Sequence, residues 1–366
     1  MKIIVNGIEL SNAVSKVVKA ISTKTTNPIL EGIKLSVIGD ELTLTATDTE
    51  ISIEKTIKVN TYVEGDTVVP GKLFSEFVKK LENEEEIEIN IEENRMKISY
   101  GSSEGYINVL NVEEFPLINK EIREKSFTIK QKDFKELILK SSFACSLDEA
   151  RPLLKGCLLE IEEDKISSVA LDGFRLAIAR KKIENATSDF KIIVSSRTLN
   201  EIIRILENDN DLVTVVVQKN VLMCEVEGTV LISRLLEGEY IDYKNIIKDE
   251  FLSVVRINKN QLLSAIDRAS IIANDKNKIV KFDIKENYMS VNAESDIGNM
   301  SENVVINLEG KDLSIAFNSK FITDCVKVID DEFINLHFNT RINPCIIKPF
   351  YGDDYLYLIL PLRINA

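Results

Sequence analysis

The chain contains the same pattern of residues more than once. Residues 27–53 align with residues 151–177 without gaps, at an offset of 124, with seven identities in 27 positions. A repeat of this length constrains the fold more than any single motif, because each copy must form the same structural unit. The identical pairs are Pro28/Pro152, Leu30/Leu154, Gly32/Gly156, Leu35/Leu159, Asp40/Asp164, Ala46/Ala170 and Asp48/Asp172.

A third and weaker copy follows the second. It aligns at an offset of 123 through the pairs Ile284/Ile161, Met289/Ile166 and Ala293/Ala170. Three copies in 366 residues give about 122 residues each, which is the size of a domain rather than of a solenoid repeat. We therefore expect domains at residues 1–122, 123–246 and 247–366, with linkers at 117–126 and 244–252.

Each copy is predicted to hold two helices among several strands. The first helix has an apolar stripe at helical spacing, formed by Leu10, Ala13, Val14, Val17, Val18 and Ile21. A short strand at 3–5 precedes it, and the alternation at 42–46 is typical of a strand. Few helices among antiparallel strands predict an α+β fold. The helices are expected at 10–24, 71–82, 131–145, 196–207, 259–273 and 319–329.

Charge is distributed unevenly between helices and strands. The chain carries a net charge of −13, which by itself argues against binding nucleic acid. The six helical ranges, however, hold 15 basic and 8 acidic residues, so they carry +7 and the remainder carries −20. A basic face on an acidic body is one interpretation. The alternative is that lysine simply favours exposed helical positions.

The sequence offers little material for catalysis. The single histidine, His337, stands in an alternating stretch and is expected to be structural. Asp48, Asp172 and Glu294 occupy corresponding places in the three copies, where turn or strand-end carboxylates that accept backbone N–H groups are more common than acid–base pairs. We expect no catalytic residue, no metal site and no cofactor.

Localisation signals are equally sparse. The first ten residues lack the apolar core of a signal peptide, and no stretch approaches the roughly 18 apolar residues of a membrane helix. The five cysteines are widely spaced and odd in number, which favours buried thiols in a reducing compartment. These features predict a cytoplasmic protein with no membrane partner.

Three motifs together resemble a known family. They are Glu113–Pro116 (EEFP) at the end of the first copy, Ala170–Ala177 (ALDGFRLA) in the second, and Tyr357–Ile364 (YLILPLRI) at the end of the third. In this order and spacing the chain resembles, over its whole length, the beta subunits of bacterial DNA polymerase III, which are DNA sliding clamps. The resemblance implies a head-to-tail homodimer that forms a pseudo-sixfold ring, with helices lining the hole and sheets outside.

The resemblance also implies function and partners. The family is non-catalytic: it encircles double-stranded DNA without reading its sequence and gives the replicative polymerase its processivity. The polymerase, the clamp loader and other proteins with clamp-binding motifs bind the family's clamps through short peptides, in one shared groove. Family DNA contacts correspond to Lys24 and Arg151, and the basic residues that open each second helix are weaker candidates for such contacts: Lys72, Arg197 and Lys320.

The peptide groove of the family lies between the second and third domains. A short peptide with Leu- or Phe-sized side chains would bind there. Phe174 stands where the family often has histidine and Asn245 where a basic residue is common, so peptide preference is open. The corresponding residues are Leu154, Leu171, Gly173, Phe174, Arg175, Leu176, Ile241, Asn245, Ile246, Leu358, Leu360, Pro361, Leu362 and Arg363. For Leu171 and Leu176 a purely structural role in the core remains an alternative.

The dimer contact of the family joins an edge strand of the first domain to the third domain. Here that implies Tyr106 and Ile107 against Ile271 and Ile272.

A two-substrate enzyme and a protein-only scaffold remain rival hypotheses. The repeat gives an enzyme no natural site, and a protein-only scaffold would have no reason for basic helices. A trimer is disfavoured because it would place nine domains in the ring rather than six.

Overall fold

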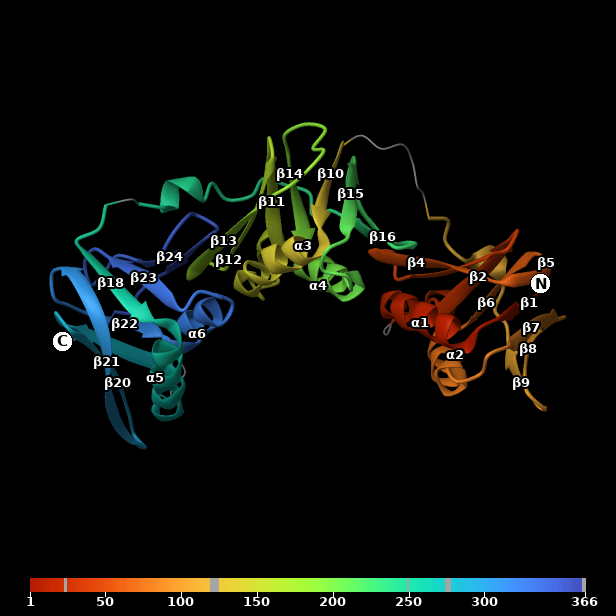
Figure 1. The fold of residues 1–366 in the computed structure, drawn as a ribbon, viewed down its shortest axis with the longest axis horizontal. Coiled ribbons are helices and arrows are strands. Elements are labelled where there is room, and N and C mark those ends of the chain that lie inside the picture. Colours follow the sequence, from red (N-terminus) through yellow and green to blue (C-terminus); the bar gives the residue numbers. More distant parts are fainter. Residues whose placement is uncertain (23–24, 119–124, 249, 274–277, 364–366) are drawn as a thin grey trace. The chain divides into compact units, whose positions relative to one another are not determined.

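The same ten elements occur in each third of the chain: a strand, a helix, four strands, a second helix and three strands. This order is seen in a computed structural model that describes residues 1–22, 25–118, 125–248, 250–273 and 278–363 (Figure 1). The first copy comprises β1 (Lys2–Val5), α1 (Gly7–Val17), β2 (Gly32–Ile38), β3 (Glu41–Thr47), β4 (Ile51–Lys58), β6 (Gly65–Pro70), α2 (Gly71–Val78), β7 (Ile87–Glu92), β8 (Arg95–Tyr100) and β9 (Ser103–Asn108), plus a short extra strand, β5 (Asn60–Val63).

The other two copies follow the same plan. The second comprises β10 (Lys125–Lys130), α3 (Gln131–Leu139), β11 (Gly156–Glu162), β12 (Lys165–Leu171), β13 (Arg175–Lys182), β14 (Phe190–Ser195), α4 (Ser196–Ile205), β15 (Leu212–Gln218), β16 (Val221–Val226) and β17 (Thr229–Arg234). The third comprises β18 (Ser253–Asn258), α5 (Lys259–Ile272), β19 (Ile279–Ile284), β20 (Tyr288–Ser295), β21 (Gly298–Gly310), β22 (Leu313–Asn318), α6 (Ser319–Lys327), β23 (Phe333–Phe338), β24 (Cys345–Pro349) and β25 (Tyr355–Ile359).

All six predicted helices are present, but several differ at their ends. Helix α1 begins at Gly7 rather than at residue 10, because the side chain of Asn6 accepts hydrogen bonds from the backbone N–H groups of Ile8 and Glu9. Asn258 caps α5 in the same way. The first and second helices end earlier than expected, and each continues as a 3₁₀ turn, at Val18–Ala20 and Lys79–Leu81.

The chain forms two compact units that do not coincide with the three copies. The first consists of residues 1–131 and 200–235, and the second of residues 132–199 and 236–366. The first unit holds a five-stranded sheet, β5-β1-β7-β8-β9, and an eight-stranded sheet, β10-β15-β16-β17-β4-β3-β2-β6. In this unit α1 and α2 pack on each other and on the strands of the larger sheet. The predicted stripe is confirmed in part: Leu10, Ala13, Val14 and Val17 are buried, whereas Val18 and Ile21 lie beyond α1 and are half-buried.

The second unit is built on one twelve-stranded sheet. Its order is β14-β11-β12-β13-β25-β24-β23-β18-β21-β20-β19-β22. Helices α5 and α6 pack together, α5 against β18 to β21 and α6 against β22 and β25. All five cysteines of the chain are buried, as expected.

Strand pairing between copies explains why the units cut through the second copy. In the first unit the last strand of the second copy, β17, pairs with the third strand of the β2–β6 group, β4. In the second unit the equivalent strands pair in the same way, β25 with β13. The first pairing joins half of the second copy to half of the first in one sheet, and the second joins the other half of the second copy to all strands of the third. Each half of the second copy therefore belongs to a different unit.

The predicted linkers are only partly irregular. The first overlaps β10, which begins at Lys125. The second contains a 3₁₀ turn at Lys244–Ile246, and the neighbouring Tyr243 is buried. Of the helices in the described parts of the chain, none combines the length and apolar character needed to cross a membrane.

Candidate functional site

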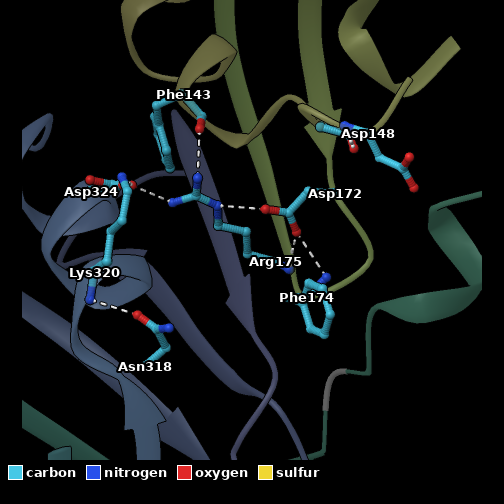
Figure 2. A network of polar contacts seen from close by, with 9 residues as sticks. Phe143, Asp148, Asp172, Phe174, Arg175, Asn318, Lys320 and Asp324 are labelled. Carbon is cyan, nitrogen blue, oxygen red and sulfur yellow. Dashed lines mark hydrogen bonds and ion pairs between the residues drawn. The ribbon is translucent and has the colours of Figure 1, made fainter. Parts of the chain in front are cut away.

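The second unit contains a buried ionic network centred on Arg175. The Arg175 side chain is 7% exposed. Its guanidinium donates from Nε to Asp172 Oδ2 at 3.0 Å, from Nη1 to Asp324 Oδ2 at 2.7 Å, and from Nη2 to the backbone oxygen of Phe143 at 2.8 Å. Figure 2 shows the side chain reaching these three acceptors. We call Asp172, Arg175, Asp324 and Lys320 the Arg175 network, because Lys320 Nζ also donates to Asp324 Oδ2, at 2.6 Å.

The network fixes the turn that presents Phe174. Oδ1 of Asp172 accepts the backbone N–H groups of Phe174 and Arg175 at 2.8 and 3.0 Å. Gly173 has a φ of +94°, which favours glycine at this turn. Phe174 is consequently 59% exposed, and its ring stacks on Phe321 with centroids 6.0 Å apart. The guanidinium carbon of Arg175 lies 4.8 Å from the centroid of the same Phe321 ring.

An apolar cluster lies beside this turn, where β13 pairs with β25. Leu176 stands opposite Leu358, and Leu360 N donates to the backbone oxygen of Phe174 at 2.9 Å. Tyr243 is buried in the cluster, and Tyr240 and Ile247 pack against it. The segment that follows β17 therefore covers one side of the cluster. The buried members are Leu154, Leu158, Val169, Leu171, Leu176, Ile178, Ile193, Tyr243, Ile346, Leu356 and Leu358.

The predicted groove residues divide into a core and a rim. Leu154, Leu171, Leu176 and Leu358 are at most 5% exposed, so for Leu171 and Leu176 the structure places the side chains in the core. Arg175 is likewise buried and its guanidinium is hydrogen-bonded internally. Four large apolar side chains remain exposed and form what we call the Phe174 rim: Phe174, Ile241, Ile246 and Leu360.

The remaining predicted residues lie around the rim. Gly173, Asn245 and Arg363 are exposed, whereas Pro361 and Leu362 are half-buried. Asn245 Nδ2 donates to Asp242 Oδ2 at 2.7 Å. Leu362 forms an isolated bridge with Ala316, which lies in the strand before α6.

The basic candidates are exposed where the structure describes them. Lys72 and Lys320 stand in the first turns of α2 and α6, and Arg197 stands in the first turn of α4. Arg151 precedes a 3₁₀ turn, and its side chain, 57% exposed, lies 3.7 Å from Asp148. Lys24 lies outside the described residues.

Several helix lysines and arginines are paired with acidic side chains rather than free. Lys16 binds Glu207 at 2.9 Å, Lys140 binds Asp330 at 2.7 Å and Arg268 binds Glu302. The charge counted on the helices therefore overstates the charge that is available to a ligand.

The predicted interface residues are only partly accessible. Tyr106 is 50% and Ile271 is 70% exposed, but Ile107 is 4% exposed, so its side chain belongs to its own domain. Tyr106 and Ile107 lie on β9, which ends its sheet in the described structure.

Two predicted structural roles are confirmed. Asp48 Oδ1 accepts the backbone N–H groups of Glu50 and Ile51, as Asp172 Oδ1 accepts those of Phe174 and Arg175 at the equivalent turn.

His337 is the second of these residues. Its ring packs against Phe251, with ring centroids 4.7 Å apart. Burial, followed by the nearby Lys348, lowers the pKa of His337 to about 4, so the ring is neutral at physiological pH. For Glu294, which stands near the end of β20, the role as a structural carboxylate stays a prediction.

The sequence did not point to Asp324 or Phe321, on which the network depends. One signal was available, because each second helix carries an acid four residues after its opening base: Lys72/Glu76, Arg197/Glu201 and Lys320/Asp324. Only the third acid binds Arg175. Glu201 instead pairs with Arg204, and its buried Oε2 finds no hydrogen-bond partner among the described residues.

Comparison with known proteins gives a consistent result. The domains described as the N-terminal, central and C-terminal domains of the DNA polymerase III beta subunit match residues 1–119, 128–242 and 244–363. The beta sliding clamp of Halalkalibacterium halodurans is 33% identical over 366 residues, covering 96% of each chain. The DNA polymerase sliding clamp of Bacillus subtilis superposes with a TM-score of 0.96 at 30% identity, and a putative beta subunit from Eubacterium rectale with 0.95 at 34%, each over the full length of both chains.

Proposed function

This chain belongs to the family of DNA polymerase III beta subunits, and on that premise we propose that it is a sliding clamp that encircles duplex DNA and tethers the replicative polymerase. It is a processivity factor and not an enzyme. Its three clamp domains correspond to residues 1–122, 123–246 and 247–366. It works in the cytoplasm at the nucleoid, with the polymerase, the clamp loader and other motif-bearing proteins as partners.

Ring closure follows from the strand pairing between copies. Within the chain, the last strand of one copy pairs with a strand of the preceding copy, namely the third strand after the first helix. In this way β17 pairs with β4, and β25 pairs with β13. Two strand edges of this kind have no such partner in the described structure. They are β9, at the end of its sheet, and the first half of β21, on the side away from β20. Exposed edges need a partner to avoid promiscuous pairing.

We assign β9 of one protomer to β21 of its partner. Ile53 stands opposite Leu231 in one junction and Ala177 opposite Tyr357 in the other. The equivalent positions in the free edges, read through the repeat, are Met300 and Gly105. This register places Glu104 opposite Ser301 of the partner subunit, and it brings the backbone of Tyr106 and Ile107 into the interface. A head-to-tail homodimer closes the ring with six domains.

Engineered cysteines test this register. Glu104→Cys combined with Ser301→Cys in one chain should give a disulfide-linked dimer on mild oxidation. The pair Glu104→Cys and Asn303→Cys, displaced by two residues, should not. The natural cysteines are all buried, so they give little background. Cross-linking of the displaced pair alone would refute the register without touching the clamp assignment.

The DNA-facing surface is proposed from the helices. Exposed lysines and arginines give an attraction to phosphates that does not depend on base sequence and that weakens with salt. Lys72, Arg197, Lys320 and Arg151 are the described candidates, and Lys24 completes the set. A topological ring needs no tight grip, so a modest number of such contacts suffices.

The Phe174 rim is proposed as the peptide-binding site. Its exposed apolar side chains lie beside a preformed apolar cluster, and burial of a Leu- or Phe-sized side chain contributes roughly 1.5–3 kcal/mol. Ordering a short peptide costs about 2–5 kcal/mol, which offsets much of this gain, so weak and reversible binding is expected. Such affinity lets polymerase and clamp loader exchange on the same site.

One experiment tests the ring most directly. A clamp loader places the protein on nicked circular DNA, the complex is gel-filtered in high salt, and the DNA is then linearised. Retention on the circle with loss from the linear form supports encirclement. Equal loss from both forms in salt would mean that binding is only electrostatic, and would overturn the proposal.

A further inference from the structure

Lys320 and Arg175 share one acceptor atom. Both donate to Oδ2 of Asp324, at 2.6 and 2.7 Å. Lys320 is the exposed partner, with 59% of its side chain accessible, whereas Arg175 is 7% exposed. A single carboxylate therefore touches both a candidate DNA contact and the residue that supports the Phe174 rim.

The path from Asp324 to Phe174 is short and rigid. Arg175 is held at its other side by Asp172, which also binds the backbone N–H of Phe174. Phe321, three residues before Asp324 on α6, lies beneath both the guanidinium and the Phe174 ring. Figure 2 shows Arg175 between Asp172 and Asp324, with Phe174 at the end of the turn. A shift of Arg175 must consequently move or loosen Phe174.

The charges of the network determine whether a DNA contact at Lys320 strengthens or weakens the hold on the Phe174 turn. Asp172 and Asp324 balance Arg175 and Lys320, so the network is neutral as it stands. When Lys320 turns to a phosphate, the whole charge of Asp324 acts on Arg175, and in a largely buried setting that strengthens the pair. DNA at Lys320 should thus hold the Phe174 turn more firmly.

We propose that Asp324 is a positioning residue that couples DNA contact at Lys320 to peptide binding at the Phe174 rim. This inference rests on the proposed function, since it needs both ligands. Asp324 binds both Lys320 and Arg175 when DNA is absent, and Arg175 alone when a phosphate takes Lys320. By linkage, peptide binding favours the DNA contact to the same degree.

The Arg175–Asp324 pair is not repeated at the corresponding positions where the first and second copies meet. In the first copy Ile51 occupies the position of Arg175, so that position carries no guanidinium. In the second copy Glu201, the counterpart of Asp324, pairs with Arg204 of its own helix. The link between helix and turn is present where the Phe174 rim lies.

Removing the carboxylate should move two affinities in opposite directions. Asp324→Asn frees Lys320, so the dissociation constant for a duplex of about 30 base pairs at about 50 mM salt should fall about twofold. The same change loosens Arg175, so the dissociation constant for a labelled synthetic peptide with two leucines and a C-terminal phenylalanine should rise about fivefold. Fluorescence anisotropy measures both.

Matched variants isolate the coupling. Glu286→Gln removes an exposed carboxylate in the turn between β19 and β20. It should change the affinities for DNA and for peptide less than Asp324→Asn does. Lys320→Gln and Lys327→Gln each remove one lysine of α6 and should weaken DNA binding similarly. Only Lys320→Gln should also tighten peptide binding, by about the strength of an exposed ion pair. The lysine variants carry the test if Asp324→Asn fails to fold.

The outcomes separate the inference from the function. Opposite shifts in Asp324→Asn, with Lys327→Gln leaving the peptide unaffected, support the coupling. Shifts of the same sign, or an unchanged peptide affinity, would refute it while the clamp assignment stands. A wild-type protein that binds neither the peptide nor DNA would instead overturn the proposed function.

Discussion

Leu176 and Leu358 lie opposite each other in β13 and β25, and their strands join the second copy of the repeat to the third. The two residues are 2% and 3% exposed, and both belong to the apolar cluster under the Phe174 rim. The same contact therefore stabilises the fold and supports the proposed peptide site. Leu360, two residues after Leu358, is 38% exposed and belongs to the rim instead.

Leu358→Ala and Leu360→Ala should separate these two roles. Removing the buried leucine should lower the free energy of unfolding by about 2–5 kcal/mol, because a cavity is left in the core. Removing the exposed leucine should lower the free energy of unfolding by under about 1 kcal/mol. It should weaken binding of the synthetic peptide with two leucines and a C-terminal phenylalanine about fivefold. Urea denaturation and fluorescence anisotropy measure the two effects. Equal losses of stability would contradict the division into core and rim.

The basic helix positions predict a specific dependence on salt. Lys72→Gln, Arg197→Gln and Lys320→Gln should each reduce the slope of log affinity for duplex DNA against log salt by about 1. Lys285→Gln, on the turn between β19 and β20, should leave the slope unchanged. The slope is measured by titrating duplex DNA at a series of salt concentrations. An equal effect of all four variants would point to net charge rather than to a helical surface.

His337 should make stability depend on pH. Its pKa is about 4 in the folded protein, below the ordinary value of 6.5, chiefly because of burial. Between these values the unfolded chain takes up a proton that the folded protein does not, so this contribution is complete above pH 6.5 and is lost as pH falls toward 4. The loss should be about 1–2 kcal/mol, after allowance for the partial exposure of the ring.

A neutral variant isolates this contribution from other titrating groups. His337→Gln should lose less stability than the wild type between pH 7 and pH 5, both followed by urea denaturation. Parallel curves for the two proteins would show that the ring is not protected from protonation.

Local patterns predicted the repeat, all six helices and the Asp48 and Asp172 turns, because these depend on spacing within a few residues. They missed the start of α1, since Asn6 was not recognised as a cap. They also missed the pairing of β13 with β25 and the bond from Arg175 to Asp324, whose residues are 149 apart in the chain. Contacts over such separations depend on how whole elements pack, which no local period records.

The groove residues show the same limit. Resemblance assigns Leu154, Leu171, Leu176 and Arg175 to a binding groove, which stays a prediction, whereas only the structure shows that their side chains are buried. A hydrophobic residue in a strand has the same local signature whether it faces a core or a ligand. The rim residues Phe174 and Leu360 differ only because a turn and a strand end expose them.

Asp172 and Asp48 offer the same substitution in two settings. Each accepts two backbone N–H groups at its turn, and Asp172 also binds the buried guanidinium of Arg175. Asp172→Asn keeps an amide oxygen for the turn yet removes a charge that balances Arg175, so it should lower the free energy of unfolding by about 3 kcal/mol. Asp48→Asn also keeps an amide oxygen for its turn and, with Ile51 at the position of Arg175, should cost about 1 kcal/mol or less. Urea denaturation of both variants measures the difference, and equal costs would mean that the Arg175 network contributes nothing to stability beyond the turn itself.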